Sequence, residues 1–302
     1  MTPFAASTVL RVPAVAYAAA EKPADWKNFV LGAGIQCAEA ASLGMPFEVW
    51  KTRMGRHRNE TTSEAFMNVY RRGGVSGFWA GLGPKMIESA SKGAILMYSK
   101  EAINDVCLAS GMGVTSSGIL AGAGGGVSQV VVMGPCTFLV TGAVTGDKSV
   151  STMDRISRTW KAQGLKGFYP GGTAIAFRQA TNWASRQGFT EFVREQMKVG
   201  IHKDKSAKLT KTEEALSGII GGTMSCWNHP FEVARIEAQS RADQGQKGMS
   251  MISVLTMITK EQGVAGLFKG LIPRIGLGIW QTLFMVTGVK LVKDSLKDAG
   301  IV

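Results

Sequence analysis

Polar side chains recur at fixed positions inside three otherwise apolar segments, each of which follows a glycine-rich motif. The positions seven and eleven residues after the last glycine of each motif hold Glu88 and Lys92, Arg178 and Asn182, and Leu277 and Gln281. Residues four apart share one face of a helix, so each segment places at least one polar group on that face. Because a polar group facing lipid is costly, we expect these faces to line a wet interior. Arginine binds carboxylates through two parallel hydrogen bonds, which favours a carboxylate ligand.

A second set of charges follows a proline in two of three further apolar segments. The sequence reads Pro46-Phe-Glu48-Val-Trp-Lys51 in the first copy and Pro230-Phe-Glu232-Val-Ala-Arg235 in the third, whereas Pro135-Cys-Thr137-Phe-Leu-Val140 keeps the proline without the charges. An unpaired charge inside a membrane is expensive, so these residues are candidates for ion pairs between helices that close a pathway. The alternative is that the charges stand at helix ends and extend into water.

Both sets belong to an internal repeat of about 95 residues. The motif GxxGaaxG, in which "a" is aromatic or large and apolar, ends at Gly81, Gly171 and Gly270, and a proline precedes each of these glycines by 35 to 40 residues. Each repeat is predicted to hold a long helix broken by its proline, a short amphipathic helix and a second long helix. The short helices are expected near Glu64–Arg72, Ser151–Ala162 and Ser250–Gln262.

The composition is that of a helical membrane protein with polar faces. Of the 302 residues, 45% are hydrophobic and 19% are charged, and no Asp, Glu, Lys or Arg occurs in the 39 residues from Leu108 to Gly146. A membrane helix needs about 20 mostly apolar residues. A soluble helical repeat, which is the alternative, would need polar outer faces that this run lacks. Cysteines and histidines show no metal-binding spacing and no phosphate-binding loop occurs, so we expect neither an enzyme nor a cofactor.

The proline and glycine motifs resemble those of the mitochondrial carrier family, whose hallmark is Px[DE]xx[KR] at the end of each odd-numbered helix. The resemblance extends from about Trp26 onward. It implies an all-α membrane protein of six tilted transmembrane helices with pseudo-threefold symmetry around a central cavity, plus short matrix helices. We expect a disordered N-terminal tail at 1–25 and three repeats at 26–112, 113–205 and 206–302.

The resemblance also implies a matrix gate built from the proline motifs. Its expected members are Pro46, Glu48, Lys51, Pro135, Pro230, Glu232 and Arg235. In the family each acid pairs with the base of a neighbouring repeat. Of these pairs, only Glu232 with Lys51 keeps both members in this sequence. We therefore expect a weakened gate with a lower barrier to opening.

The runs 88–94, 178–186 and 273–281 further resemble members of the family that exchange tricarboxylates for dicarboxylates. This implies an antiporter of citrate and 2-oxoglutarate that works by alternating access. By position, the implied substrate contacts are Glu88, Lys92 and Leu96, then Arg178 and Gln179, then Arg274, with Asn182, Arg186 and Gln281 completing the shell. Lys92, Arg178 and Arg274 against Glu88 sum to +2, which suits a dianion, or a trianion entering with a proton. Glu88 either neutralises Lys92 four residues on or accepts a proton.

The net charge of +12 suits anionic partners. We expect a monomer in the mitochondrial inner membrane, with both termini toward the intermembrane space and anionic, cardiolipin-type lipid at the basic loops. Two alternatives stay open. One is a carrier of another di- or tricarboxylate. The other is a mitochondrial DNA-binding or maintenance role, which the resemblance also implies but for which the sequence holds no recognition motif.

Overall fold

The computed structural model describes residues 26–204 and 206–298, and the expected tail at 1–25 lies outside them. Both described ranges are helical and contain no strand. The long helices of the three repeats are α1 (Trp26–Glu39), α2 (Met45–Arg56) and α4 (Leu82–Ala109); α5 (Val114–Ser128), α6 (Val130–Thr145) and α8 (Gly172–Ile201); and α9 (Lys211–Met224), α10 (His229–Asp243) and α12 (Leu271–Asp298). The short helices are α3 (Thr62–Gly73), α7 (Thr152–Gln163) and α11 (Met251–Gln262), close to the ranges predicted from the sequence.

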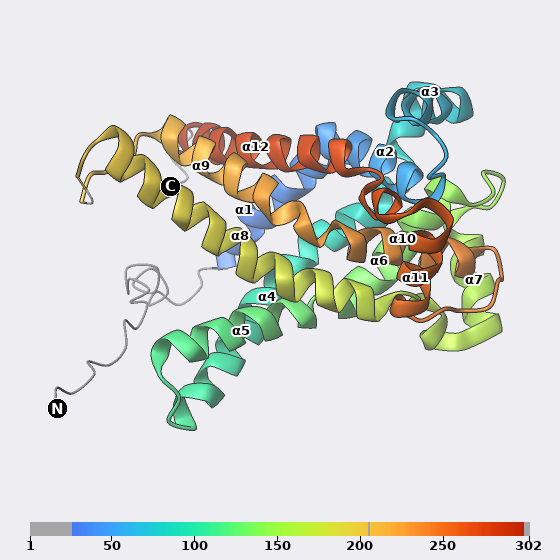
Figure 1. Ribbon diagram of the computed structural model, residues 1–302, viewed down its shortest axis with the longest axis horizontal. Helices are drawn as coiled ribbons and strands as arrows, with labels where there is room; N and C mark the ends of the chain where they lie inside the picture. The colour runs from blue at the N-terminus through green and yellow to red at the C-terminus, as the bar shows by residue number, and fades with distance from the viewer. Residues whose placement is uncertain (1–25, 205, 299–302) are drawn as a thin grey trace, which may run out of the picture.

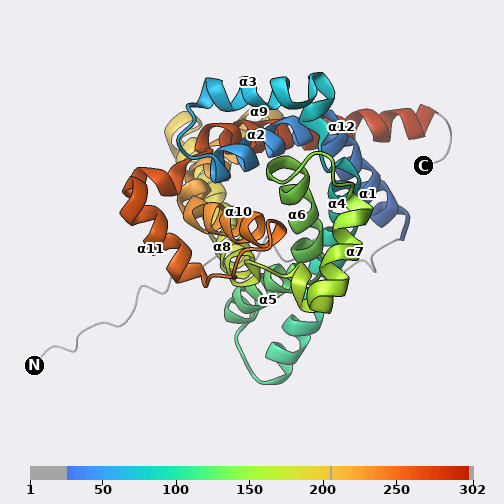
Figure 2. The same cartoon turned by 90° about the vertical axis from the view of Figure 1, so that its right-hand side faces the viewer.

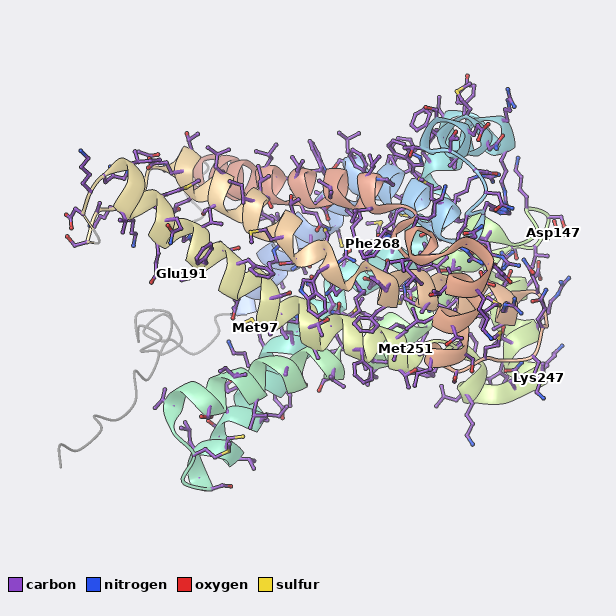
Figure 3. All side chains as sticks on the ribbon, viewed as in Figure 1. Met97, Asp147, Glu191, Lys247, Met251 and Phe268 are labelled. Atoms are coloured by element: carbon purple, nitrogen blue, oxygen red, sulfur yellow. The ribbon has the colours of Figure 1, made fainter. Side chains whose placement is uncertain are left out.

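The long helices close into a ring. Contacts run in the order α1, α4, α5, α8, α9 and α12, and α12 returns to α1. At one end of the ring α2, α6 and α10 all contact one another. Figure 1 shows the long helices running side by side toward this end, and Figure 2 shows α2, α6 and α10 around its middle with α3, α7 and α11 outside them. Asp147 and Lys247 mark this end in Figure 3, whereas Glu191 lies toward the other end.

Each odd-numbered span is interrupted a few residues before its proline. A π-helical turn at Ala40–Gly44 joins α1 to α2, a 41° bend at Gln129 joins α5 to α6, and a 3₁₀ turn at Ser225–Asn228 joins α9 to α10. Pro46 and Pro230 occupy the first turn of the following helix, where a missing N–H costs nothing. The predicted break at the proline itself is therefore wrong, because the proline begins or continues the second helix.

The last glycine of each repeat motif joins that repeat to the next. Gly81, Gly171 and Gly270 adopt left-handed conformations with φ of +84°, +71° and +88°. A methyl group added to them would lie, respectively, 3.0 Å from Cα of Val140, 3.3 Å from Cα of Arg235 and 3.0 Å from the carbonyl oxygen of Lys51. These three neighbours are the sixth residues of the three proline motifs. Since glycine alone tolerates both the conformation and the close approach, the motif closes the ring with threefold regularity.

Large apolar side chains are exposed along the long helices. Ile87, Ile119, Val131, Phe177 and Ile272 are each more than half exposed. An apolar surface of this extent marks contact with a membrane or with another protein. Judged singly by length and apolar character, no helix of the described residues qualifies as a membrane span, whereas the bent pair Ser116–Ser128 and Val130–Thr145 does.

Candidate functional site

The charges of the first and third proline motifs form one buried network where α2 and α10 meet. Lys51 Nζ lies 2.7 Å from Oε1 of Glu232 across the two helices and 2.8 Å from Oε2 of Glu48 on its own helix. Nη2 of Arg235 lies 2.9 Å from Glu232 and 3.8 Å from Glu48. The four side chains, called the gate network below, are at most 7% exposed, so they do not extend into water.

Repeat two contributes neutral side chains to the same level of the bundle. Thr137 and Val140 occupy the positions of the missing acid and base. Nη1 of Arg235 donates instead to Oγ1 of Thr141 at 3.3 Å and to Oε1 of Gln239 at 2.7 Å. Nε2 of Gln239 in turn donates to Oγ1 of Thr137 at 2.8 Å. Thus α6 joins the network through hydroxyl and amide groups, which hold it less strongly than an ion pair would.

A second ion cluster at this end surrounds Glu237 on α10. Its fully buried carboxylate lies 2.6 Å from Arg56, 2.8 Å from Arg58 and 2.7 Å from Arg241. Arg56 belongs to α2 and Arg58 to the loop that follows it, so this cluster reinforces the contact between repeats one and three. Neither these arginines nor Glu237 was assigned a role from the sequence.

Two acids outside the spanning helices serve as structural caps. The Glu64 carboxylate accepts a hydrogen bond from the backbone N–H of Thr61 at 2.8 Å at the start of α3, which lowers the pKa of Glu64. Asp147, in the loop after α6, accepts from the backbone N–H of Ser149 at 2.9 Å, which lowers the pKa of Asp147. Both acids are ionised near neutral pH, so neither carries protons at this end of the molecule.

On α4, Glu88 pairs with Lys85 and not with Lys92. Lys85 Nζ lies 3.1 Å from Oε1 of Glu88 and 4.0 Å from Oε2 of Glu48. Glu88 is 2% exposed, and its second oxygen has no hydrogen-bond partner among the described residues. The charges of Glu88 and of Glu39 act on Lys92, but its ammonium forms no ion pair within the described ranges. The four-residue spacing had suggested Lys92 as the partner of Glu88, which is wrong, because spacing alone does not fix a side-chain rotamer.

On α8, two of the predicted substrate contacts are already engaged. Nε of Arg178 lies 3.1 Å from Oε2 of Glu232, which brings this arginine against the gate network. Gln179 is buried, and its amide nitrogen donates to Oε1 of Gln129 at 2.5 Å. Gln129 stands at the bend between α5 and α6 and also donates to the carbonyl of Lys92 at 2.9 Å. Gln179 therefore supports the bend as well as flanking Arg178.

Four further predicted contacts are half-buried, namely Leu96, Asn182, Arg186 and Gln281. Nη2 of Arg186 donates to Oγ1 of Thr282 at 3.4 Å, which links α8 to α12. Gln281 lies beside the carboxylate of Glu39, a buried acid on α1 that the sequence interpretation missed. A signal for it was present, since Glu39 is the only charged residue in the run 28–47.

On α12, Arg274 is held at the beginning of α10. Its Nη1 lies 3.3 Å from Nδ1 of His229, and its Nη2 donates to Oδ1 of Asn228. The charges of Arg178 and Glu232 act on its guanidinium, so it shares the interior with the gate network, although no carboxylate of the described residues pairs with it. Neither Asn228 nor His229 was assigned a role from the sequence.

Each of α4, α8 and α12 thus carries a predicted or neighbouring site residue that is basic and has no carboxylate partner within the described part of the chain. These residues are Lys92 on α4, Arg186 on α8 and Arg274 on α12. Unneutralised cations beside a buried ion network attract an anion, and carboxylate groups satisfy such cations best. The arrangement can therefore bind an organic acid inside the ring and bring it next to the gate network.

Comparison with known proteins agrees with the threefold architecture. The sequence profile of mitochondrial carrier proteins matches residues 22–110, 113–199 and 208–300. The citrate/oxoglutarate carrier protein of Saccharomyces cerevisiae is 37% identical over 278 residues, which cover 88% of each chain. The mitochondrial 2-oxodicarboxylate carrier of Mus musculus is 27% identical over 80% of this chain and 87% of its own. The tricarboxylate transport protein of Saccharomyces cerevisiae is 24% identical over 82% and 88%, respectively.

The three profile matches fall on the three repeats that the glycine motifs join into a ring. Each repeat supplies two spans, one interrupted before its proline and one continuous. The family has an all-α membrane fold of six transmembrane helices, and its members are transporters and not enzymes. With its proline motifs, its ring of helices and a profile match over nearly its whole length, this chain belongs to the mitochondrial carrier family.

Proposed function

We propose that this protein is an antiporter of the mitochondrial inner membrane that exchanges citrate for 2-oxoglutarate. The observation that carries the proposal is a trio of basic side chains, Lys92, Arg186 and Arg274, that have no carboxylate partner among the described residues. Citrate carries three carboxylates and 2-oxoglutarate two, so both are anions of the kind that such cations attract. The name of the 37% identical relative supports this choice of substrates.

Arg178 supplies the link between substrate binding and gating. Its ion pair with Glu232 at 3.1 Å couples the predicted site to the gate network. A substrate carboxylate that approaches Arg178 competes with Glu232 for the guanidinium and loosens the network around Lys51. Substrate binding then shifts the population toward the state open at this end, which is alternating access. Because Arg178 returns to Glu232 when the site empties, transport proceeds as exchange.

Six spans, an even number, place both termini on the same side of the membrane. We assign this side to the intermembrane space and place α3, α7 and α11 on the matrix side. The basic residues near these short helices suit anionic, cardiolipin-type lipid headgroups. The threefold ring closes within a single chain, so a monomer suffices for transport.

A second candidate substrate class is other 2-oxodicarboxylates. Two relatives, from Dictyostelium discoideum and Mus musculus, are named 2-oxodicarboxylate carriers. Such acids carry the same two carboxylates as 2-oxoglutarate, so the same cations could hold them. The choice between these acids depends on chain length and not on charge.

An exchange assay in liposomes tests the proposal. The purified protein is reconstituted into liposomes that contain citrate or buffer, and uptake of labelled 2-oxoglutarate is measured, with a panel of unlabelled acids and nucleotides as competitors. We expect rapid uptake only into citrate-loaded liposomes, with competition by carboxylic acids. Equal uptake into buffer-filled liposomes would overturn antiport, and competition by nucleotides alone would overturn the substrate assignment.

A further inference from the structure

The 3₁₀ turn before α10 contacts two of the arginines proposed to meet the substrate, Arg178 and Arg274. Asn228, its last residue, donates from Nδ2 to Oγ1 of Thr181 at 3.2 Å and to the carbonyl of Arg178 at 3.4 Å on α8. Its Oδ1 accepts from Nη2 of Arg274 on α12. Asn228 is fully buried, so these bonds form without competition from water. One amide side chain thus bridges α8 and α12 at the level of the site.

The tautomer of His229 is set by its second hydrogen bond. Its Nε2 lies 2.9 Å from the carbonyl oxygen of Lys269. Because a carbonyl only accepts, Nε2 carries the proton, and in the neutral ring Nδ1 is left as a bare acceptor. This acceptor lies 3.3 Å from Nη1 of Arg274. His229 is fully buried, and its ring therefore faces Arg274 with a fixed lone pair.

Together the two residues orient the guanidinium of Arg274. One N–H of each terminal nitrogen is used, by His229 and by Asn228. Neither bond uses Nε, so Nε–H and a second N–H on each terminal nitrogen are left as donors for a carboxylate. These two bonds hold the guanidinium in place before the substrate arrives, which lowers the entropic cost of ordering this side chain on binding.

We propose that Asn228 and His229 are positioning residues that present the guanidinium of Arg274 to a carboxylate of the substrate. The inference rests on the proposed function of Arg274 in substrate binding, and it adds two residues that do not themselves touch the substrate. Asn228 ends the 3₁₀ turn and His229 begins α10, the helix that also carries the gate residue Glu232, so the bonds to Arg274 depend on the position of α10.

Two substitutions of the same histidine separate positioning from packing. In His229→Asn the amide oxygen takes the place of Nδ1 and keeps the acceptor for Arg274, while the bond to Lys269 is lost. In His229→Gln the amide nitrogen takes the place of Nε2 and keeps the bond to Lys269, while the acceptor for Arg274 is lost. Each variant loses one buried hydrogen bond, so a purely structural role predicts equal effects.

The measurement is the KM for citrate in proteoliposomes loaded with 2-oxoglutarate, with the thermal midpoint in detergent as the check on folding. We expect His229→Gln and Asn228→Ala to raise KM about tenfold with a smaller change in maximal rate, because a hydrogen bond to a charged group is lost. His229→Asn should keep a KM close to that of the wild type. Equal KM values for His229→Gln and His229→Asn would overturn the positioning role. Absence of any carboxylate uptake by the wild-type protein would overturn the proposed function itself.

Discussion

The guanidinium of Arg178 lies 3.1 Å from the carboxylate of Glu232, so a single acid belongs both to the candidate substrate site and to the gate network. The same carboxylate holds Lys51 at 2.7 Å and Arg235 at 2.9 Å. Cations from α2, α8 and α10 thus converge on Glu232. Glu48, its counterpart in repeat one, lies 2.8 Å from Lys51 but 3.8 Å from Arg235 and 4.0 Å from Lys85. The two acids occupy equivalent motif positions but have unequal roles.

This inequality predicts unequal losses of stability. Removing one partner of a buried ion pair costs about 3–5 kcal/mol, because the remaining charge is left without compensation. Glu232→Gln should therefore lower the thermal midpoint of the purified protein more than Glu48→Gln, which leaves Lys51 paired with Glu232. Thermal unfolding of both variants in detergent checks this. A midpoint for Glu48→Gln at or below that of Glu232→Gln would argue against Glu232 as the centre of the network.

Restoring the missing charges of repeat two should slow transport. Position 140 is equivalent to position 51, because the backbone of Val140 lies against Gly81 as that of Lys51 lies against Gly270. The double variant Thr137→Glu, Val140→Lys places an acid near Arg235 and a base near Glu48, which completes three pairs between repeats. We expect a higher thermal midpoint and a lower maximal exchange rate than in the wild type or in either single variant. A stabilised protein that exchanges as fast as the wild type would show that gate opening does not limit the rate.

The closing glycines predict a position-specific effect of one methyl group. Gly270 has φ of +88° and faces the carbonyl of Lys51, whereas Gly278 lies within α12 with open space around it. Gly270→Ala should destabilise the protein by about 1–3 kcal/mol through backbone strain and displacement of α2. Gly278→Ala should be neutral or slightly stabilising, because alanine favours helix. The thermal midpoints of the two variants decide the matter, and equal midpoints would speak against the ring closure.

The repeat, the long and short helices and the pairing of Lys51 with Glu232 were within reach of the sequence. They depend on spacing and on charge complementarity, which a sequence displays directly. The positions of the breaks between α1 and α2, α5 and α6, and α9 and α10 could not be predicted from the sequence, because they depend on which side chain satisfies a freed backbone group. In the first break the indole of Trp79 donates to the carbonyl of Ala41 at 2.6 Å across 38 positions of sequence. Such long-range bonds leave no local pattern.

The candidate site shows the same limit. Polarity in an apolar helix identified Lys92, Arg178 and Arg274, but it gave no information on which of them are already paired. The partner of Glu88 turned out to be Lys85, and Arg274 is held by Asn228 and His229. These partners are fixed by rotamers and by the approach of neighbouring helices.

The pairing of Glu88 with Lys85 predicts a change in substrate preference. Glu88→Gln removes a negative charge and leaves Lys85 with a weaker partner, so the interior becomes more positive by one charge. The variant should shift the ratio of kcat/KM values toward citrate and away from 2-oxoglutarate, because the more highly charged anion gains more. Competition between the two acids in the liposome assay measures this ratio. An unchanged ratio would mean that Glu88 does not contribute to the field at the site.

The central claim is that basic side chains inside the ring bind the carboxylates of the substrate. Its most direct test is the initial rate of citrate/2-oxoglutarate exchange for Arg178→Ala and Arg274→Ala, beside Lys161→Ala, which removes an exposed charge on α7. We expect a loss of at least about tenfold for each arginine variant, equivalent to about 1.4 kcal/mol or more, and a wild-type rate for the lysine variant. Wild-type exchange by both arginine variants would contradict it.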